Sequence, residues 1–574
     1  MAEFDLVLRG GTIVDGSGER PFIGDVAILA GRIAAIGVVE GTGTREIDVA
    51  GRLVTPGFVD VHTHYDGQAI WSDRLNPSSA HGVTTVVTGN CGVGFAPCRP
   101  QDHDLLINVM EGVEDIPGVV MAEGLKWDWE TFPEYLDALD GRSRDIDMAV
   151  YLPHSPLRVY VMGDRGARRE AATPDDLSRM RTIATEAIKA GALGFATSRT
   201  FFHRTAAGDA IPSFDSSQVE LQEIAMGMAD AGGGVMQAVL DVPNHSWVEE
   251  LKGIQAIIEK SGRPATFTLA APNSGPPMWL PVMDILDQAQ ASGQPLTAQV
   301  FPRPIGMIAG LALSTNPFSF CPSFRPLDGL PLDQKVTAMR DPATRAAIIG
   351  EAPVDGHPLG AMARNWDWIF PLRDPPEYEP SADESVAARA KAAGITPQEI
   401  AYDMLLEDDG RAMLYIALGN FHDNRLDVVK TMMDHPNTIL GLGDGGAHYG
   451  VICDASYPTF MLSYWARDRQ GEQVPIERAV KMLARDPAHA VGLLDRGLIS
   501  VGLKGDLNVI DLERMQLHKP EIRHDLPAGG RRLDQRATGY DYTIVSGEVI
   551  AEHDQPTNAR PGKLVRGAQQ APTA

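Results

Sequence analysis

Hydrophobic and polar positions follow one pattern at the two ends of the chain and another in the middle. In the first fifty residues, apolar and polar positions alternate in short stretches broken by glycine, as in DLVLRGGTIVDG and DVAILAGRIAAIG. Alternation of this kind with glycine turns predicts β-hairpins. The far end repeats it in GDLNVIDL and YDYTIVSGEVIAE. We therefore expect residues 1–55 and 499–560 to form one small β-sandwich domain built from both termini.

The middle of the chain alternates continuous apolar runs with amphipathic segments. The runs are 57–64, 82–90, 147–154, 191–198, 233–240, 265–272, 295–302 and 437–444. Segments such as 174–190 and 246–260 lie between them and place apolar residues at helical spacing. Buried parallel strands read as continuous apolar runs. Eight such strand–helix units predict an α/β fold in which residues 56–498 form a TIM-type (β/α)8 barrel.

Two further segments stand outside this rhythm. The seventh run ends at 302 and the eighth begins at 437, too far apart for a simple loop. The interval, at about 303–437, contains helical patterns and aromatic, proline-rich pieces such as NWDWIFPLRDPPEYEP. We expect it to be an insertion that forms a lid over the barrel mouth. The last residues, 563–574, are expected to be a loose C-terminal tail.

Composition narrows the class of protein. The chain has 574 residues, 44% hydrophobic and 22% charged, which is typical of a folded globular protein. Its net charge of −26 argues against nucleic acid and anionic membranes as partners. No signal peptide, membrane span or disulfide framework is recognisable, since four cysteines are few for this length. We expect a cytoplasmic protein with a small-molecule substrate. Whether it is a homo-oligomer is left open.

The first barrel run carries two candidate metal ligands. His62 and His64 stand at its C-terminal end, where the active sites of this fold lie. Residues two apart in a strand project from the same face, and two neutral imidazoles there can bind one ion such as zinc. The same spacing also arises by chance, and histidine pairs are often only hydrogen-bonded. The position at a strand end is what favours a metal.

Two more candidates end other runs. The second run continues into TGNCG, which places Cys91 at a strand end, and the eighth ends in LGDGGAH, which places Asp444 there. A thiolate is a strong zinc ligand, whereas most buried cysteines are inert. A carboxylate can bind metal and accept a proton from water, although Asp before Gly is usually a turn former. The coincidence of all four at one barrel face carries the prediction.

The motifs VTPGFVDVHTH, GVTTVVTGNCGVGFAP, GALGFATS and LGDGGAH resemble the amidohydrolase superfamily, in particular its D-aminoacylase branch of N-acyl-D-amino-acid deacylases. The resemblance continues through PIERAVKMLARDPAHAVGLLD to DYTIVSGEVI and covers nearly the whole chain. It implies a metal-bearing barrel with a small β-sandwich. It also implies that His62, His64 and Cys91 bind metal, and that Asp444 is both ligand and general base.

Two departures from the family alter these expectations. The family takes a further histidine from each of the fifth and sixth strands, but here those strands read GGVMQAVLDV and ATFTLAAPN. Gln237, Val239 or Leu269 stands near where a ligand would be. We therefore expect one metal ion, Zn²⁺ or another divalent metal, bound by the four remaining ligands; a degenerate site is the alternative. The family's arginine after the catalytic aspartate is also absent.

Other polar residues at the barrel mouth are candidates for substrate binding. They are His154, Arg199, His203 and His448. An arginine there could hold a carboxylate through its two-pronged guanidinium, and a histidine could hydrogen-bond substrate or replace a missing ligand. For each of them, an ordinary structural pairing is an equal interpretation.

The sequence thus predicts a metal-dependent hydrolase of an amide-like C–N bond, in an N-acyl amino acid or an aromatic amide. The metal would polarise the carbonyl and activate water, and Asp444 would transfer the proton to the leaving nitrogen. One alternative is a metal-dependent, non-hydrolytic lyase that decarboxylates or cleaves a C–C bond on the same scaffold. Another is a metal-free binding protein derived from the enzyme.

Overall fold

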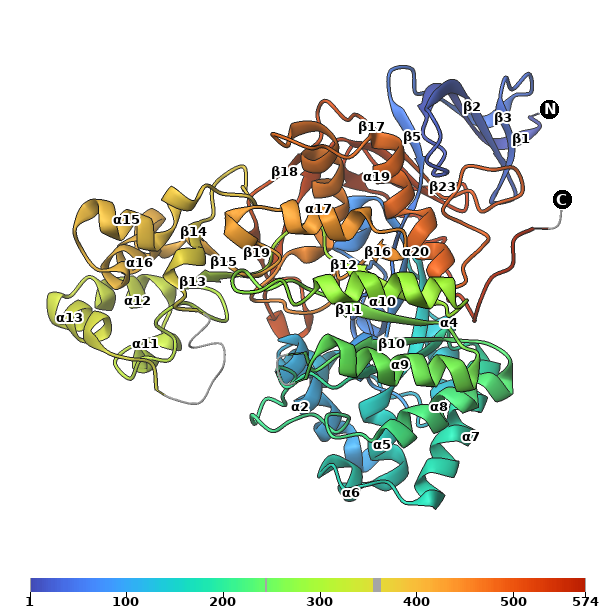
Figure 1. Cartoon of the computed structure of the whole chain (residues 1–574). Coiled ribbons are helices and arrows are strands. Elements are labelled where there is room, and N and C mark those ends of the chain that lie inside the picture. Colours follow the sequence, from blue (N-terminus) through green and yellow to red (C-terminus); the bar gives the residue numbers. More distant parts are fainter. Residues whose placement is uncertain (1, 243–244, 355–362, 573–574) are drawn as a thin grey trace.

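A computed structural model describes residues 2–242, 245–354 and 363–572 of the chain. The strands near the two termini form one nine-stranded mixed sheet, in which β5 pairs with β17 and places Val54 opposite Val509. This confirms that strands from both ends of the chain build one β domain (Figure 1). Its strands are β1 (Phe4–Ile13), β2 (Phe22–Leu29), β3 (Arg32–Gly37), β4 (Gly43–Asp48), β5 (Leu53–Pro56), β17 (Leu507–Ile510), β22 (Tyr540–Val545), β23 (Glu548–Glu552) and β24 (Gln555–Pro556).

A second sheet of eight parallel strands confirms the predicted barrel. The strands follow one another in sequence order around it, and each of the eight apolar runs supplies one. They are β6 (Phe58–Asp60), β7 (Val83–Thr88), β8 (Asp147–Pro153), β9 (Gly194–Ser198), β10 (Val235–Val239), β11 (Ala265–Leu269), β12 (Leu296–Val300) and β16 (Thr438–Leu440). Beyond the ends of β6 and β16 the ring closes, because the Asp444 N–H donates to the His62 carbonyl at 3.0 Å and the His64 N–H to the Gly445 carbonyl at 2.8 Å.

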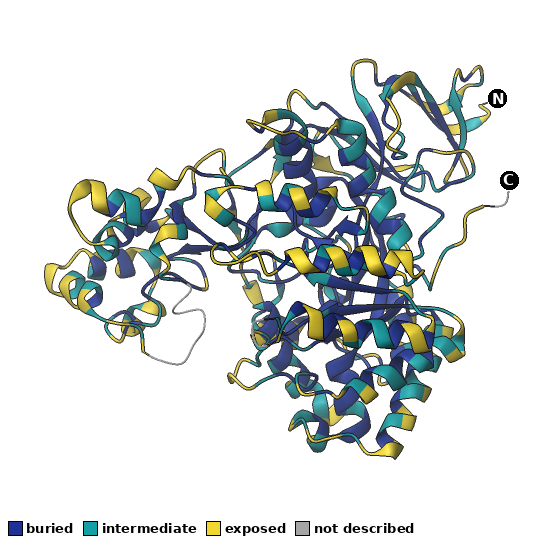
Figure 2. Ribbon diagram, in the orientation of Figure 1, coloured by how far each residue is buried: buried dark blue, intermediate teal, exposed yellow. Residues whose placement is uncertain are grey.

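Helices cover the outside of the barrel and turn their polar faces to solvent (Figure 2). The main ones are α2 (His103–Glu114), α4 (Phe132–Asp140), α5 (His154–Met162), α7 (Pro174–Ala190), α8 (Gln218–Ala231), α9 (Trp247–Ser261), α10 (Leu280–Ala291), α17 (Asp427–Asp434), α19 (Ile476–Leu483) and α20 (Arg485–Ala490). Local sequence sets their starts: Ser246 and Glu249 form a reciprocal capping box that begins α9. In the described part of the chain, every helix is too short or too polar to cross a lipid bilayer.

The insertion after β12 forms a lobe with its own apolar core, which includes Phe318, Tyr402 and Leu414. The lobe projects from the barrel in Figure 1. Its antiparallel sheet is built from β13 (Ile305–Gly310), β14 (Ile369–Pro371) and β15 (Met413–Gly419), and its helices are α11 (Arg325–Asp328), α12 (Leu332–Met339), α13 (Pro342–Gly350), α15 (Val386–Ala393) and α16 (Pro397–Leu405). At its base, Ile308 donates to the Val451 carbonyl, in the loop that follows β16. The insertion therefore borders the barrel mouth, and closure over the mouth stays a prediction.

The C-terminal segment is not the loose tail expected from the sequence. The Met148 N–H donates to the Lys563 carbonyl at 3.0 Å, and the Val565 N–H donates to the Met148 carbonyl at 2.8 Å. Farther along, Gln569 pairs with Gly492 at 2.9 Å. Because these backbone groups are bonded and Val565 is buried, the segment up to Gln569 is part of the barrel's surface.

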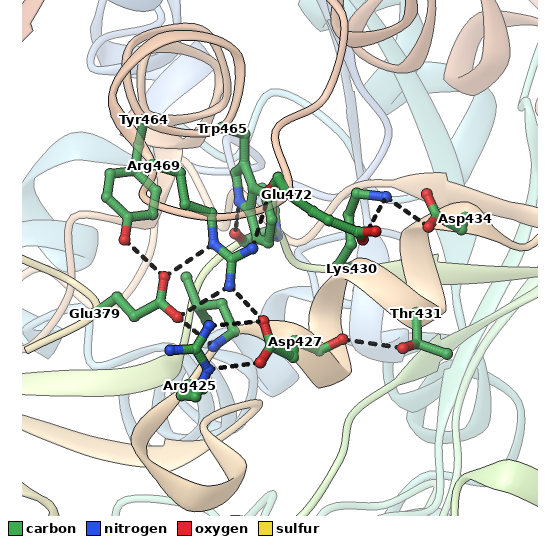
Figure 3. Close-up of polar contacts among 12 residues, drawn as sticks. Glu379, Arg425, Asp427, Lys430, Thr431, Asp434, Tyr464, Trp465, Arg469 and Glu472 are labelled. Carbon is green, nitrogen blue, oxygen red and sulfur yellow. Dashed lines mark hydrogen bonds and ion pairs between the residues drawn. The ribbon is translucent and has the colours of Figure 1, made fainter.

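Figure 3 shows an ion-pair network around the buried side chain of Arg469, which joins the insertion to the segment after β16. Arg469 donates to both carboxylate oxygens of Glu379, at 3.0 and 3.1 Å, and to Asp427 at 2.6 Å. Glu379 belongs to the insertion, whereas Arg469 follows the helical turn 461–468 and Asp427 begins α17. The Arg469 guanidinium also lies 4.5 Å from the centre of the Trp465 ring. One side chain therefore joins three segments that are distant in sequence.

Substituting Arg469 by methionine is expected to lower the free energy of unfolding by about 3–5 kcal/mol, because the Glu379 carboxylate would be left buried without its partner. Urea unfolding followed by tryptophan fluorescence measures this. Arg411→Met is the control, since that side chain is 60% exposed and pairs only at the surface with Asp408; its loss should cost less than about 1 kcal/mol. Equal midpoints for the two variants would contradict the prediction.

Candidate metal centre

Two histidines and a cysteine converge at the end of the barrel strands. His62 and His64 follow β6, and Cys91 follows β7. The Nε2 atom of His62 lies 3.3 Å from the Cys91 sulfur, and the Nε2 atom of His64 lies 3.9 Å from it. One ligand atom from each of the three residues can be chosen so that all lie within 4.8 Å of one another. All three side chains are buried.

The glycines around Cys91 let its backbone enter this crowded place. Gly89 has φ +81°, and a Cβ atom there would lie 2.5 Å from the Tyr151 carbonyl oxygen. A Cβ on Gly92 would lie 2.8 Å from the Cα of Thr197. Only glycine fits such positions, and the turn GNCG they permit aims the thiol at the two imidazoles.

Asp444 lies beside the two imidazoles, on the other side of the ring closure. Its Oδ1 atom lies 3.6 Å from His62 Nε2 and 3.5 Å from His64 Nε2. Its backbone is left-handed, with φ +47°. Before it, a Cβ on Gly443 would lie 2.0 Å from the Asp60 carboxylate, so this glycine is also required. Asp444 is 21% exposed, whereas the two imidazoles are 1% exposed, so the carboxylate is the group that faces the opening.

The separations from the two imidazoles to the thiol and to the carboxylate are close to those between ligands of one zinc ion. Zinc bonds of about 2.0–2.3 Å at tetrahedral angles place two ligand atoms roughly 3.3–3.6 Å apart. The four separations that join the imidazoles to the thiol and the carboxylate run from 3.3 to 3.9 Å. Nitrogen, sulfur and oxygen donors in this number are also what a zinc ion prefers.

Burial prepares the ligands for a cation. Desolvation lowers the pKa of His62 to about 4 and that of His64 to about 3, so both imidazoles are neutral at neutral pH. Burial, with the nearby carboxylates of Glu114 and Asp444, raises the pKa of the Cys91 thiol. In the metal-free protein the thiol is therefore protonated, and an ion must displace that proton to bind the sulfur.

The second ring nitrogen of each histidine faces a different partner. His62 Nδ1 lies 2.8 Å from Gln299 Oε1, an amide on β12. His64 Nδ1 lies 3.4 Å from Glu114 Oε1, at the end of α2. Partners of this kind fix which nitrogen of a metal-binding imidazole carries the hydrogen.

Glu114 was missed by the sequence reasoning. It belongs to the buried face of α2, whose members are Leu106, Val109, Met110, Val113 and Glu114. A carboxylate on the apolar stripe of an amphipathic helix is the signal that could have identified it, because such a position buries a charge.

The missing histidines of the fifth and sixth strands are replaced by residues with other contacts. Gln237 Oε1 accepts a hydrogen bond from the Cys91 N–H at 3.2 Å, so it contacts the backbone of that residue. Leu269 is fully buried in the apolar core, and Val239 packs against that core. Among the described residues, Gln237, Val239 and Leu269 therefore do not replace the missing histidines as metal ligands beside Cys91.

The structure places His154 in a closed polar network. Its Nδ1 lies 2.8 Å from Thr197 Oγ1 and its Nε2 2.8 Å from Glu220 Oε1. Glu220 also pairs with Arg158 at 2.5 Å. Because both ring nitrogens are occupied, the arrangement assigns His154 to the packing around α5 and α8 rather than to substrate binding.

The three other candidates, Arg199, His203 and His448, are more exposed than His154. His203 has a pKa lowered to about 3, first by burial and then by the imidazoles of His448, His64 and His62. Its Nδ1 atom is buried and has no hydrogen-bond partner among the described residues. Arg199 lies 3.6 Å from Glu250.

Comparisons with known proteins agree with this architecture. The family model described as the amidohydrolase family matches residues 45–551. D-aminoacylase of Alcaligenes xylosoxydans xylosoxydans is 29% identical over 566 residues, which cover 98% of this chain and 97% of that protein. N-acyl-D-glutamate deacylase of the same organism is 24% identical over 578 residues, covering 98% and 97%.

Two solved structures share the fold. The crystal structure of D-aminoacylase superposes with a TM-score of 0.64 at 22% identity and covers 98% of this chain and 100% of its own. N-acyl-D-glutamate deacylase from Bordetella bronchiseptica, complexed with zinc and a phosphonate inhibitor, gives a TM-score of 0.64 at 22% identity, covering 98% and 99%.

Proposed function

This chain belongs to the amidohydrolase family and is a hydrolase related to the D-aminoacylases, and from that membership we propose that it hydrolyses an amide-like C–N bond at one divalent metal ion. The metal ligands are His62, His64, Cys91 and Asp444, and Zn²⁺ is the ion that suits them. The observation that carries the proposal is their convergence from three strand ends at 3.3–3.9 Å.

Each group then has a role set by its position. A divalent metal at this place supplies a Lewis acid for the substrate carbonyl and lowers the pKa of water. Asp444, the more exposed ligand, takes the proton of the attacking water and passes it to the leaving nitrogen. Because Gln237, Val239 and Leu269 are not metal ligands, the site holds one ion.

The substrate is a small molecule that enters beside His203, His448 and Arg199. The unpaired buried nitrogen of His203 supports a hydrogen bond to substrate, and Arg199 supplies positive charge at the rim. The names of the relatives make N-acyl-D-amino acids the first class to test. Aromatic amides are the second class, since Phe201 and Phe202, which precede His203 in the chain, bring two rings together with centres 4.0 Å apart.

The proposal is tested by metal analysis and a substrate panel. Protein purified without added metal, then loaded with Zn²⁺, should hold about one equivalent and cleave at least one N-acyl amino acid or aromatic amide. Reaction in ¹⁸O-labelled water should place the label in the released carboxylate. Turnover without label would favour the lyase, and a protein that binds no metal after loading would favour the metal-free binding protein.

Zinc binding is expected to weaken about tenfold for each pH unit between pH 8 and pH 6, because the ion must displace the Cys91 thiol proton. The histidines add nothing in this range, since the pKa values of His62 and His64 are lowered to about 4 and about 3. Chelator competition at pH 6, 7 and 8 measures the slope.

In Cys91→Ser, the number of protons released on zinc binding should fall by one, so the tenfold change in zinc affinity per pH unit should disappear. Cys98→Ser is the matched control, because this second buried thiol also has a raised pKa, of about 12, but its sulfur contacts the Arg99 carbonyl outside the site. A slope that is the same in Cys91→Ser and in the unmodified protein would refute this assignment of the proton.

A further inference from the structure

A carboxylate with no hydrogen-bond partner among the described residues lies directly behind the proposed metal centre. Glu114 is 1% exposed, and both of its oxygens are buried and unpaired by hydrogen bonds. Its Oε1 lies 3.4 Å from His64 Nδ1 and its Oε2 lies 3.3 Å from His448 Nε2. We infer that Glu114 is a positioning residue that orients His64 toward the metal and fixes His448 at the rim of the same site.

The two nitrogens of His64 face opposite partners. Nε2 lies 3.5 Å from Asp444 Oδ1 and 3.9 Å from the Cys91 sulfur, whereas Nδ1 faces Glu114. A neutral imidazole has one N–H, and the Glu114 carboxylate 3.4 Å away favours Nδ1 over Nε2 as its position. The lone pair of Nε2 is then directed to the metal side, and a carboxylate behind the ring makes that nitrogen a stronger ligand.

The partner of His62 differs from that of His64, because it is a neutral amide and not a carboxylate. The partner of His62 Nδ1 is the neutral amide of Gln299, which in turn donates to Thr266 Oγ1 at 3.0 Å. That pair is complete without an ion. When ionised, Glu114 would place negative charge behind its ligand, and this charge would stabilise a cation on the far side of the ring.

Glu114 also clamps the loop that carries Asp444. Its backbone carbonyl accepts a hydrogen bond from the His448 N–H, and the next residue, Asp115, accepts one from the Gly450 N–H at 3.0 Å. The end of α2, labelled in Figure 1, is thereby joined to the segment after β16. Glu114 therefore contacts His64 through its side chain and His448 through both its side chain and its backbone.

The fold alone does not account for this residue. A buried carboxylate without hydrogen bonds costs free energy, so Glu114 should weaken the metal-free protein and be compensated when an ion is bound. A residue that serves only packing behaves in the opposite way, because its removal lowers stability with or without metal. This difference separates the two roles experimentally.

The experiment rests on the proposed function and measures Zn²⁺ affinity by chelator competition for the full chain, with Glu114→Ala and Glu114→Gln as variants. Removing a carboxylate behind a metal-binding histidine typically weakens metal binding about 10–100-fold, which we expect for Glu114→Ala. Glu114→Gln keeps an acceptor for the Nδ1 hydrogen and should lose less. Glu111→Gln, three residues earlier on the same helix and exposed, should bind as the unmodified protein does.

Two further measurements exclude a merely structural effect. The melting temperature of metal-free Glu114→Gln should equal or exceed that of the unmodified protein. In a His64→Asn background, Glu114→Gln should no longer change Zn²⁺ affinity, because the ring it orients is absent. Undiminished affinity in both Glu114 variants, or an equal effect without His64, overturns the inference. An unmodified protein that binds no zinc overturns the proposed function itself, which is a separate result.

Discussion

Asp444→Asn is expected to reduce kcat/KM by at least about 1,000-fold on any substrate found in the panel, because general acid–base catalysis alone supplies about 10²–10⁴-fold. The substitution also weakens one metal contact, since an amide is a poorer ligand than a carboxylate. The fold should persist. Asp444 has φ +47°, and asparagine tolerates this left-handed conformation as well as aspartate does.

The control for that experiment is Asp423→Asn. Asp423 has φ +54° in a surface turn and is 84% exposed, so it tests the same change of side chain in the same backbone conformation. Its activity and melting temperature should stay unchanged. If Asp444→Asn retained activity, Asp444 would be only a turn former and the proposed proton transfer would be wrong.

His62→Asn is expected to weaken Zn²⁺ binding by at least about 100-fold. Structural zinc sites bind with about 10–16 kcal/mol, roughly 3 kcal/mol for each of four ligands, and each 1.4 kcal/mol is tenfold. Activity at limiting zinc should fall in proportion. Metal analysis after dialysis against a chelator, followed by titration with zinc and activity assay, measures both quantities.

His422→Asn is the matched control, because His422 lies at the surface with its side chain 34% exposed. It should hold as much zinc as the unmodified protein. Excess zinc should restore part of the activity of His62→Asn, since the other three ligands remain. An unchanged zinc affinity in His62→Asn would place the metal elsewhere and would remove the basis of the proposed hydrolase mechanism.

The sequence predicted most of the architecture. The eight apolar runs each became one barrel strand, in order, because burial on both faces of a parallel strand is written directly in its residues. The alternating ends of the chain likewise became one β domain. His62, His64, Cys91 and Asp444 could be singled out because each ends a strand, and strand ends of a barrel meet at one face by construction.

Residues that work through partners far away in the chain could not be identified in this way. Glu114 has no motif around it, and its part in the site depends on the depth at which α2 packs against the barrel. Gln299 orients His62 across 237 positions of sequence. The segment from 563 to Gln569 was expected to be loose, but it hydrogen-bonds to backbone groups that come together only in the folded barrel.

What the sequence determined by itself was the order of the elements, the ring of strands and the residues placed at its mouth, since these follow from local periodicity. The tertiary structure decided which ring nitrogen of His62 and His64 faces Cys91 and Asp444, and that both ring nitrogens of His154 are occupied by Thr197 and Glu220. It also decided that a carboxylate lies behind His64. The physical reason is that hydrogen bonds and charge pairs act over a few ångströms, and such distances between remote residues exist only after packing.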